Sequence, residues 1–413
     1  MTERKKTSPV NKTNTQLNRR EFIAGTGAAA LSFTVMKPEL VRGAAANSKI
    51  KLGLIGCGGR GNWITNLFQK HGGYEIASVA DYFQDRVDKC GDKCKVSPSR
   101  RYTGLSGYKK LLEDKLDAVA IITPPYFRPE QAAAAVEAGC HVFAAKPVAV
   151  DVPGSHSIAA SAKKAAAKKL CFIVDFQTRP DKFYSEAVKR VHNGAIGEFT
   201  FGESSYHCNR LTSNTKPGTP EARLRNWVFD KALSGDIITE QNIHTIDVAS
   251  WIMNKPPLYA FGSGGRKVRV DVGDCWDHFA LLFQYADNVG ITFSSRQFNG
   301  HGTKPDGIKN RMFGDKGVLE AQYGGQVIIR GKNFYRGGKC PAIYQEGAVS
   351  NIAMFHKDIT ESRYDNSTVA PSVRSNLVTI LGRTAAYQKR LVSWEEIVNS
   401  KEKCVADLKG LKA

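Results

Sequence analysis

Two segments of the chain combine residue types that can move a proton. One contains Lys146, which directly follows a short apolar run. The other spans residues 234–247 and contains Glu240, His244 and Asp247. Proteins use ammonium, carboxylate and imidazole groups as general acids and bases. Both segments are therefore candidates for general acid–base chemistry.

The spacing of the second segment predicts that its polar side chains share one face of a helix. If residues 239–253 form a single helix, Glu240, His244 and Asp247 fall within an arc of about 60°. A carboxylate on that face can hold the imidazole in one tautomer. We expect His244 to be the main base and Glu240 to orient it. Two alternatives stay open. Lys146 can instead be read as a surface ammonium without a chemical role, and Glu240 with His244 as a structural carboxylate–histidine pair between domains.

A glycine-rich loop lies near the start of the chain. Residues 56–61 read Gly-Cys-Gly-Gly-Arg-Gly, which fits G-x-G-x-x-G, and they join an apolar strand-like segment to a helical one. Such a loop makes a tight turn, lets the backbone approach a pyrophosphate, and places a helix N-terminus against it. The predicted cofactor-binding residues of this loop are Gly56, Gly58, Gly59, Arg60 and Gly61. A glycine turn in an unrelated α/β fold is the alternative.

A carboxylate follows at the position where a dinucleotide ribose would bind. Asp81 stands 25 positions after Gly56, at the end of the second strand-like segment. A carboxylate there binds ribose hydroxyls and repels a 2′-phosphate, which favours NAD over NADP. Arg86 lies close by in the sequence and keeps NADP possible.

The order of the elements predicts two domains. From residue 49 to 174, apolar strand-like segments alternate with helical ones, which is typical of a doubly wound parallel sheet. After about residue 178, strand-like segments dominate, among them residues 268–272. Three segments there are helical, namely residues 183–192, 239–253 and 375–390. The predicted fold class is α/β. It comprises a Rossmann domain over residues 47–176 and an α+β domain with a large, mostly antiparallel open sheet over residues 177–413.

The amino terminus has the layout of a removable export signal. Residues 1–20 are polar and basic and end in Arg19-Arg20, a mildly apolar stretch follows, and residues 44–46 are alanines. Paired arginines in this context are typical of the twin-arginine route. We expect residues 1–46 to direct export to the periplasm, with the cofactor loaded beforehand and tightly bound. A disordered tail followed by a short helix is the alternative.

Composition excludes several classes of protein. The 413 residues carry a formal net charge of +20 and are 42% hydrophobic, which suits a globular chain of two domains. The basic residues are scattered and no nucleic-acid reading module accompanies them, so no nucleic-acid partner is expected. No segment after the leader predicts stable membrane insertion. Among the nine cysteines, Cys90 and Cys94 suit a disulfide or a coincidence, and no metal set is predicted.

Several further motifs complete a resemblance to a known family. Over essentially everything after the leader, the chain resembles the glucose–fructose oxidoreductase / inositol dehydrogenase (Gfo/Idh/MocA) family, most closely its exported branch. The resemblance rests on residues 56–61, Thr123-Pro124, Ala138-Gly-Cys-His-Val142 with Lys146-Pro147, Asn193-Gly-Ala-Ile-Gly197, Leu224-Arg-Asn-Trp227, Ser234-Gly-Asp236, Glu240-Gln-Asn-Ile-His244 with Asp247, Arg296-Gln297, Gly314-Asp-Lys-Gly317 and Ser393-Trp-Glu-Glu396.

The resemblance implies roles for individual residues. Lys146 matches the family's lysine beside the cofactor, and Glu240 and His244 match its helix acid and histidine. Thr123 and Pro124 are expected at the cofactor. Two departures matter, because Ala145 stands where a Glu usually precedes the lysine and Glu240 replaces the commoner Asp. The first departure removes a possible partner for the charge of Lys146.

The implied activity is hydride transfer between NAD or NADP and a hydroxyl or ketone of a sugar, polyol or glycoside. A redox-assisted glycosidase, which uses bound NAD transiently and gives net hydrolysis, is the first alternative. A non-catalytic binding protein on the same fold is the second. The resemblance also implies a homo-oligomer, either a dimer or a tetramer, and a small-molecule carbohydrate substrate.

Overall fold

The computed structural model describes residues 49–413 apart from residues 214 and 305. The predicted signal peptide, residues 1–46, lies outside the described part of the chain. Within that part, no helix is long and apolar enough to cross a membrane.

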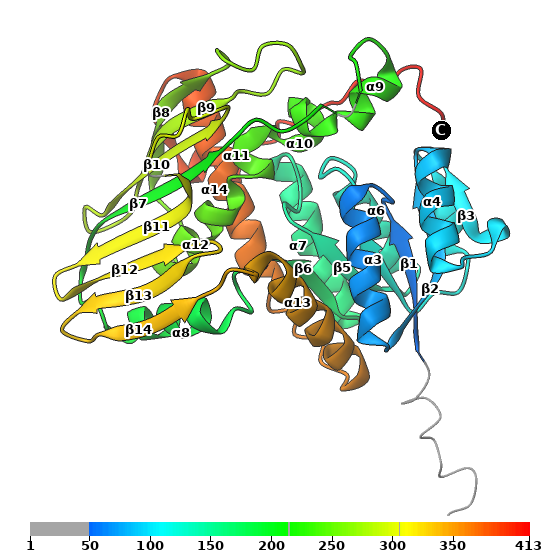
Figure 1. Cartoon of the computed structure of the whole chain (residues 1–413), viewed down its shortest axis with the longest axis horizontal. Coiled ribbons are helices and arrows are strands. Elements are labelled where there is room, and N and C mark those ends of the chain that lie inside the picture. Colours follow the sequence, from blue (N-terminus) through cyan, green and yellow to red (C-terminus); the bar gives the residue numbers. More distant parts are fainter. Residues whose placement is uncertain (1–48, 214, 305) are drawn as a thin grey trace, which may run out of the picture. The chain divides into compact units, whose positions relative to one another are not determined.

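A six-stranded, fully parallel sheet forms the first half of the structure (Figure 1). Its order, β3-β2-β1-β4-β5-β6, is that of a dinucleotide-binding Rossmann domain. The central strand β4 (Ala118–Ile121) is buried along its whole length, as a strand covered on both faces requires. The other strands are β1 (Ile50–Ile55), β2 (Tyr74–Asp81), β3 (Arg101–Thr103), β5 (His141–Ala145) and β6 (Phe172–Asp175).

Helices cover both faces of this sheet (Figure 1). Those that follow its strands are α3 (Gly59–His71), α4 (Gln84–Cys94), α5 (Gly107–Leu112), α6 (Arg128–Glu137) and α7 (Val152–Ala167). The start of helix α7 is fixed by its local sequence. The Asp151 side chain accepts a hydrogen bond from the Gly154 N–H at the start of α7, and a proline occupies its first turn.

A nine-stranded sheet forms the second half, in the order β14-β13-β12-β11-β7-β10-β9-β8-β15. All its neighbouring strands are antiparallel except β7 and β10, which are parallel. The strands are β7 (Phe199–Cys208), β8 (Tyr259–Gly265), β9 (His278–Gln284), β10 (Gly290–Gln297), β11 (Gly307–Gly314), β12 (Gly317–Gln322), β13 (Gln326–Gly331), β14 (Tyr335–Lys339) and β15 (Val392–Ser393). Both sheets agree with the predicted fold class.

Helices α8 (Lys182–His192), α12 (Ile243–Met253) and α14 (Val369–Gln388) pack on one face of this sheet. Among the residues that the structure describes, no helix covers the opposite face (Figure 1). Phe201 and Phe261 are 45% and 52% exposed. The remaining helices are α9 (Pro220–Arg225), η3 (Trp227–Phe229), α10 (Lys231–Ser234), α11 (Asp236–Glu240), α13 (Ile343–Thr360) and α15 (Trp394–Val398), with η2 (Pro98–Arg100) in the first half.

The prediction of one helix over residues 239–253 is wrong. Helix α11 ends at Glu240 and α12 begins at Ile243. The Ile237 carbonyl accepts hydrogen bonds from the N–H groups of both Gln241 and Asn242, at 3.0 and 2.9 Å, which interrupts the regular ladder. The Gln241 side chain accepts a hydrogen bond from Gln297 on β10, a tertiary contact that no periodicity encodes.

Two other segments also differ from the prediction. Residues 268–272, expected as a strand, form irregular backbone. Their Val268 and Arg269 N–H groups donate to the Asp277 side chain instead of to a neighbouring strand. Helix α13 was not predicted. It follows β14 in the sequence and packs against α3 of the first half. All nine cysteines are free, including Cys90 and Cys94.

Candidate active site

The glycine loop has the geometry that its sequence predicts. Gly56 follows β1 directly and has a φ of +105°, a conformation that residues with a Cβ rarely adopt. A Cβ on Gly56 would lie 2.8 to 2.9 Å from three backbone atoms of Ile122 and Thr123. A Cβ on Gly61 would overlap the Gly56 carbonyl oxygen. The first turn of α3 can therefore approach β1 only because these residues are glycines.

The amino end of α3 is open to an anion. Gly58 is its N-cap residue and provides no side-chain hydrogen bond to the first N–H groups of the helix. Those groups, together with the positive end of the helix dipole, form a ready binding site for phosphate. The loop and the helix end thus fit the pyrophosphate of a dinucleotide.

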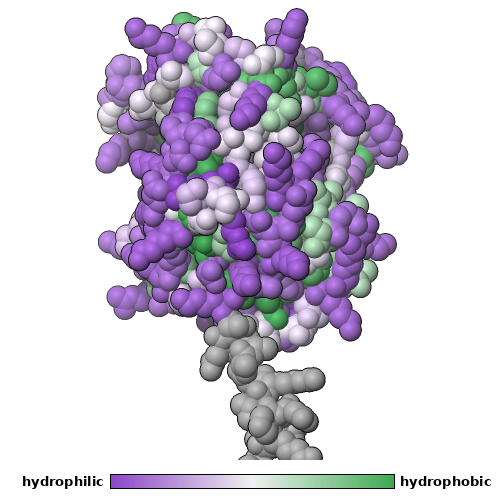
Figure 2. All heavy atoms as spheres, turned by 90° about the vertical axis from the view of Figure 1, so that its right-hand side faces the viewer, coloured by the Kyte–Doolittle hydropathy of each residue, from purple (hydrophilic) through white to green (hydrophobic). Residues whose placement is uncertain are grey.

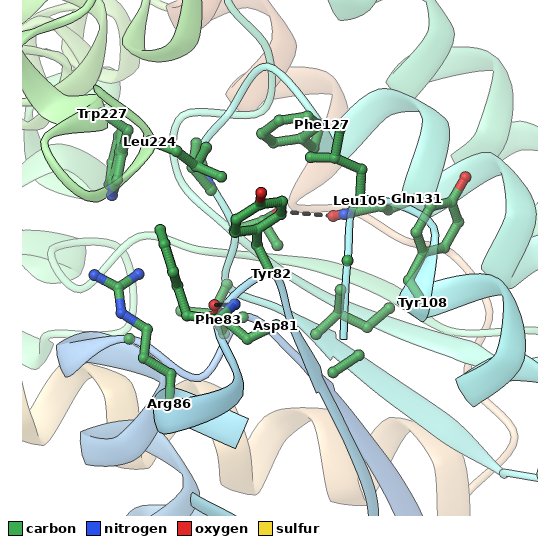
Figure 3. Close-up of a pocket in the computed structure, with 18 residues that line it drawn as sticks. Asp81, Tyr82, Phe83, Arg86, Leu105, Tyr108, Phe127, Gln131, Leu224 and Trp227 are labelled. Atoms are coloured by element: carbon green, nitrogen blue, oxygen red, sulfur yellow. Dashed lines mark hydrogen bonds between the residues drawn. The ribbon is translucent and has the colours of Figure 1, made fainter. Parts of the chain in front are cut away.

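A pocket opens beside the loop (Figure 3). It encloses about 640 Å³ of space not filled by atoms, open solvent included, which is within the range of small-molecule sites. Asp81, Thr123 and Pro124 are among its lining residues. Leu224 and Trp227, which belong to the second half of the chain, complete the lining. The predicted residues Gly56, Gly58, Asp81, Thr123 and Pro124 therefore line one cavity.

Asp81 is held firmly within this pocket. Its two carboxylate oxygens accept hydrogen bonds from the N–H groups of Cys57, at 2.7 Å, and Phe83, at 3.0 Å. Burial raises the pKa of Asp81, while the two backbone donors and the charge of Arg86 act in the opposite direction. Each oxygen retains a further lone pair for a ribose hydroxyl. Arg86 has no ion-pair partner in the described part of the chain, and its guanidinium lies 4.8 Å from the centre of the Phe83 ring.

Arg60, predicted as a cofactor residue, turns its side chain away from the pocket. Its guanidinium forms an ion pair with Asp175, at the end of β6, and donates to the Tyr344 hydroxyl at 2.6 Å. It lies 5.4 and 5.3 Å from the ring centres of Trp63 and Tyr344, which stack on each other at 4.7 Å. Only the backbone of Arg60 remains at the α3 terminus for a phosphate. Its side chain instead joins the first half of the chain to α13.

Lys146 and Glu240 form an ion pair. The Lys146 Nζ donates to the Glu240 main-chain carbonyl at 2.6 Å and lies 3.4 Å from Glu240 Oε1. Their side chains are only 11% and 14% exposed. Burial lowers the pKa of Lys146, the Glu240 charge raises it, and the Arg60 and Arg128 charges lower it. Glu240 therefore supplies the countercharge that Ala145 lacks.

Arg128 anchors the turn that carries Lys146. It is buried, and it donates to the carbonyls of Ala145, at 3.0 Å, and Pro147, on either side of the lysine. It also donates to the Thr123 carbonyl, at 2.8 and 2.5 Å. One guanidinium thus ties the turn after β4 to the turn after β5. The sequence analysis did not single out this residue.

His244 lies on the first turn of α12 and is buried, with 7% of its surface exposed. Its Nδ1 has no hydrogen-bond partner among the described residues. Burial lowers the pKa of His244 well below its usual value, and the positive charges of Lys146 and Arg60 lower it further. The imidazole is therefore neutral near pH 7. The expected contact with Glu240 is absent from the described structure, because the helix break directs that carboxylate to Lys146.

Asp247 serves a structural purpose. Its carboxylate receives two hydrogen bonds from Arg179, at 2.7 and 3.1 Å, and one from the Ser375 hydroxyl at 2.7 Å. The Asp247 side chain is fully buried. This network holds α12, which carries His244, against α14 and the segment after β6.

Aromatic side chains near His244 were missed by the sequence analysis. The Tyr323 ring centre lies 5.4 Å from the imidazole, and its buried hydroxyl has no hydrogen-bond partner among the described residues. Burial raises the pKa of Tyr206 well above its usual value, and the charge of nearby Glu240 adds to the effect. Tyr323 follows β12, and nothing in its local sequence marks it as a functional residue. Asp175, which was also missed, could have been found from the sequence, because it ends a parallel strand at the edge where ligands bind.

The arrangement can bind a hydroxylated ligand and move a proton. An ammonium, a neutral imidazole and a tyrosine hydroxyl meet beyond the carboxyl ends of the parallel strands. Within residues 49–413, apart from the two undescribed positions, no cluster of three His, Cys, Asp or Glu side chains could hold a metal ion.

Comparison with known proteins assigns the fold and the family. The chain matches a family model described as "Oxidoreductase family, NAD-binding Rossmann fold" over residues 50–174. It matches a second model, "GFO/IDH/MocA C-terminal domain", over residues 184–320. The two matches follow each other in the chain as the two sheets do.

The individual relatives are distant in sequence. The myo-inositol 2-dehydrogenase of Thermotoga maritima is 23% identical over 363 residues, which are 84% of this chain and 100% of the relative. An apo scyllo-inositol dehydrogenase from Lactobacillus casei has a TM-score of 0.66 at 20% identity, covering 84% of this chain and 99% of that one. A levoglucosan dehydrogenase in complex with NADH and levoglucosan has a TM-score of 0.67 at 18% identity, with the same coverage. The structural likeness supports the same fold, and with both family models matched, the chain belongs to the GFO/IDH/MocA family of NAD-binding oxidoreductases.

Proposed function

We propose that this protein oxidises a secondary hydroxyl of a cyclic polyol or sugar with NAD, or reduces the corresponding ketone. The observation that carries the proposal is the Lys146–Glu240 ion pair close to a neutral, buried His244. These groups lie beyond the strands that hold the glycine loop. The names of the relatives, which are dehydrogenases of inositols and levoglucosan, support a substrate of this class.

In this mechanism the protein controls the substrate proton. His244, neutral at pH 7, accepts the hydroxyl proton on its free ring nitrogen. The Lys146 ammonium donates a hydrogen bond to the same oxygen and stabilises the negative charge that develops there. Glu240 acts on Lys146 rather than on His244, because it keeps the buried amine charged and in position. When bound, the nicotinamide supplies the hydride acceptor or donor.

The surroundings of His244 suit a polyol. Tyr323 offers a buried hydroxyl without a partner, and Tyr206 and Tyr323 provide aromatic surface. Such pockets orient a ligand through a few polar groups on an apolar wall. We therefore assign Tyr323 to substrate binding rather than to proton transfer.

For the cofactor we propose NAD, retained between turnovers. The Asp81 carboxylate faces the pocket and repels a 2′-phosphate. The unpaired guanidinium of Arg86 is the feature that would favour NADP. Export through the twin-arginine route, proposed from Arg19 and Arg20, would demand retention, because free nicotinamide nucleotide is scarce outside the cytoplasm.

The first experiment is to denature the purified protein and identify any released nucleotide. The proposal predicts NAD or NADH in the wild type. It also predicts polyol-dependent formation of NADH that Lys146→Ala and His244→Ala abolish without loss of bound nucleotide. Near-native turnover in both variants would refute the site. Release of a free sugar at its original oxidation level would indicate the redox-assisted glycosidase instead.

Two further parts of the proposal concern assembly and location. We propose that the uncovered face of the nine-stranded sheet, with exposed Phe201 and Phe261, pairs with a second copy. Light scattering of the wild type and of a Phe201→Lys variant tests this pairing. Fractionation of cells that express the wild type or the Arg19→Lys/Arg20→Lys variant tests export. The proposal predicts the wild type, but not the variant, in the periplasm.

A further inference from the structure

A small hydrophobic cluster, separate from the two main cores, closes one end of the dinucleotide pocket. Its buried members come from three distant parts of the chain, namely Phe83 after β2, Leu224 and Leu233 around α9 and α10, and Ala406 near the carboxyl terminus. Leu105, Trp227, Leu408 and Leu411 pack against it among others. Phe83, Leu105, Leu224 and Trp227 also line the pocket (Figure 3). The cluster and the pocket therefore share a wall.

The segment around α9 forms one side of this wall and is pinned to the Rossmann domain. Arg225 forms a double ion-pair contact with Asp85, at 2.7 and 3.2 Å, and its guanidinium lies 3.9 Å from the Phe83 ring centre. The Tyr82 hydroxyl lies 3.4 Å from a Glu221 carboxylate oxygen. Leu224 and Trp227 are thereby held over the half of the pocket that contains Asp81.

The carboxyl-terminal tail, residues 404–413, lies across the same region (Figure 1). At its start, the Cys404 N–H donates to Asp151 at 2.9 Å. At its end, the Lys412 N–H donates to the Tyr82 hydroxyl at 3.0 Å, and the Leu105 N–H donates to the Lys412 carbonyl at 3.1 Å.

The tail also approaches the turn that precedes Leu105. A Cβ on Gly104 would overlap the Ala413 carbonyl oxygen. Tyr82, Gly104 and Leu105 are all lining residues of the pocket. The end of the tail therefore touches the pocket wall directly.

The two faces of the tail differ in character. Ala406 is buried, whereas Val405 is 78% exposed. Leu408 and Leu411 pack on the cluster from the same side as Ala406. On the end of the molecule that carries α4, β3 and the carboxyl terminus, hydrophilic side chains cover most of the surface (Figure 2). The tail therefore packs on the cluster through one apolar face and exposes the other face to solvent.

We propose that α9 with Trp227 forms a roof over the adenosine half of the dinucleotide and that the tail latches this roof shut. The proposal rests on the proposed nicotinamide cofactor and adds residues of the second half of the chain to its binding site. Release of the nucleotide then requires the tail to detach from Tyr82 and Leu105. This latch explains how the protein retains its cofactor between turnovers.

The test measures nucleotide release rather than activity. Protein loaded with NADH is mixed with excess NAD, and the decay of NADH fluorescence gives the dissociation rate. Deletion of Lys412 and Ala413 removes the two main-chain hydrogen bonds of Lys412 and the one from its Nζ to the Thr103 hydroxyl. We expect release to become about tenfold faster. Leu408→Glu, which places a charge in the cluster, should accelerate release further. Val405→Glu is the matched control on the exposed face and should release NADH at the wild-type rate.

Half-molecules locate the effect. Both latch variants should bind ADP-ribose more weakly than the wild type, with unchanged affinity for nicotinamide mononucleotide. Circular dichroism verifies that each variant is folded. If Leu408→Glu does not fold, the two-residue deletion alone tests the latch. Wild-type release rates in folded latch variants would overturn the latch while leaving the oxidoreductase proposal intact. A wild-type protein that binds no NADH would overturn the proposed function itself.

Discussion

Substitution of Gly56 by alanine tests the glycine loop most directly. The new Cβ would lie 2.8 Å from the Ile122 carbonyl carbon and 2.9 Å from two further backbone atoms. An ordinary contact begins near 3.4 Å, so β1 and the turn after β4 would have to separate by about 0.6 Å. None of the three atoms belongs to a flexible side chain. The φ of +105° adds conformational strain of about 1–3 kcal/mol.

Strain of that size converts to a loss of affinity. If the loop relaxes into a conformation that cannot bind, the apparent Kd for NADH rises by the inverse of the competent fraction. A cost of about 1–3 kcal/mol corresponds to about 5- to 150-fold. Fluorescence titration of nucleotide-free protein with NADH measures this ratio.

A second glycine provides the control. A Cβ on Gly53, within β1, would meet only the side-chain ends of Leu116 and Leu111, at 2.5 and 2.8 Å. Gly53→Ala should therefore lower Tm and leave the Kd for NADH unchanged. A Gly56→Ala protein that binds NADH within threefold of the wild type would refute the assignment of the loop, whatever its stability.

Three further predictions concern the site. Glu240→Gln removes the carboxylate beside Lys146, so the pKa of the amine should fall further, which the pH profile of kcat/KM measures. An unmoved profile contradicts the pairing. The folded-state pKa of His244 is depressed below 6.5, so the unfolded chain binds more protons and stability falls as the pH drops below 6.5, by about 1.4 kcal/mol per unit; denaturant unfolding at pH 5 and 7 should show His244→Gln losing this part of the slope. Asp247→Asn leaves Arg179 without its countercharge and should lower the free energy of unfolding by about 3–5 kcal/mol. An unchanged Tm would show that the pair does not stabilise the fold.

Local patterns were sufficient for the parts of the protein that are locally encoded. The parallel sheet follows from buried apolar strands that alternate with helices, and the prediction is confirmed by β1 to β6. The family prediction is confirmed by both family models. The twin-arginine signal at residues 1–46, the domain boundary at residue 176 and the oligomeric state stay predictions.

The helix break between Glu240 and Ile243 shows where periodicity fails. The spacing of Glu240 and His244 is the same in a continuous helix and in an interrupted one. The interruption depends on the Ile237 carbonyl and on the bond from Gln297, a residue 56 positions away from Gln241. As a result, the partner of Glu240 changed from His244 to Lys146.

The sequence by itself determined the glycine loop, the class of fold and the identities of Lys146, Glu240 and His244, because turns and strands follow from the properties of adjacent residues. Only the tertiary structure decided which of these groups pair, that Arg60 turns to Asp175, and that Tyr323 faces the imidazole. It alone brought α9 and the carboxyl-terminal tail to the dinucleotide pocket. Such contacts join residues that are far apart in the sequence, and packing of the whole chain selects them rather than any local preference.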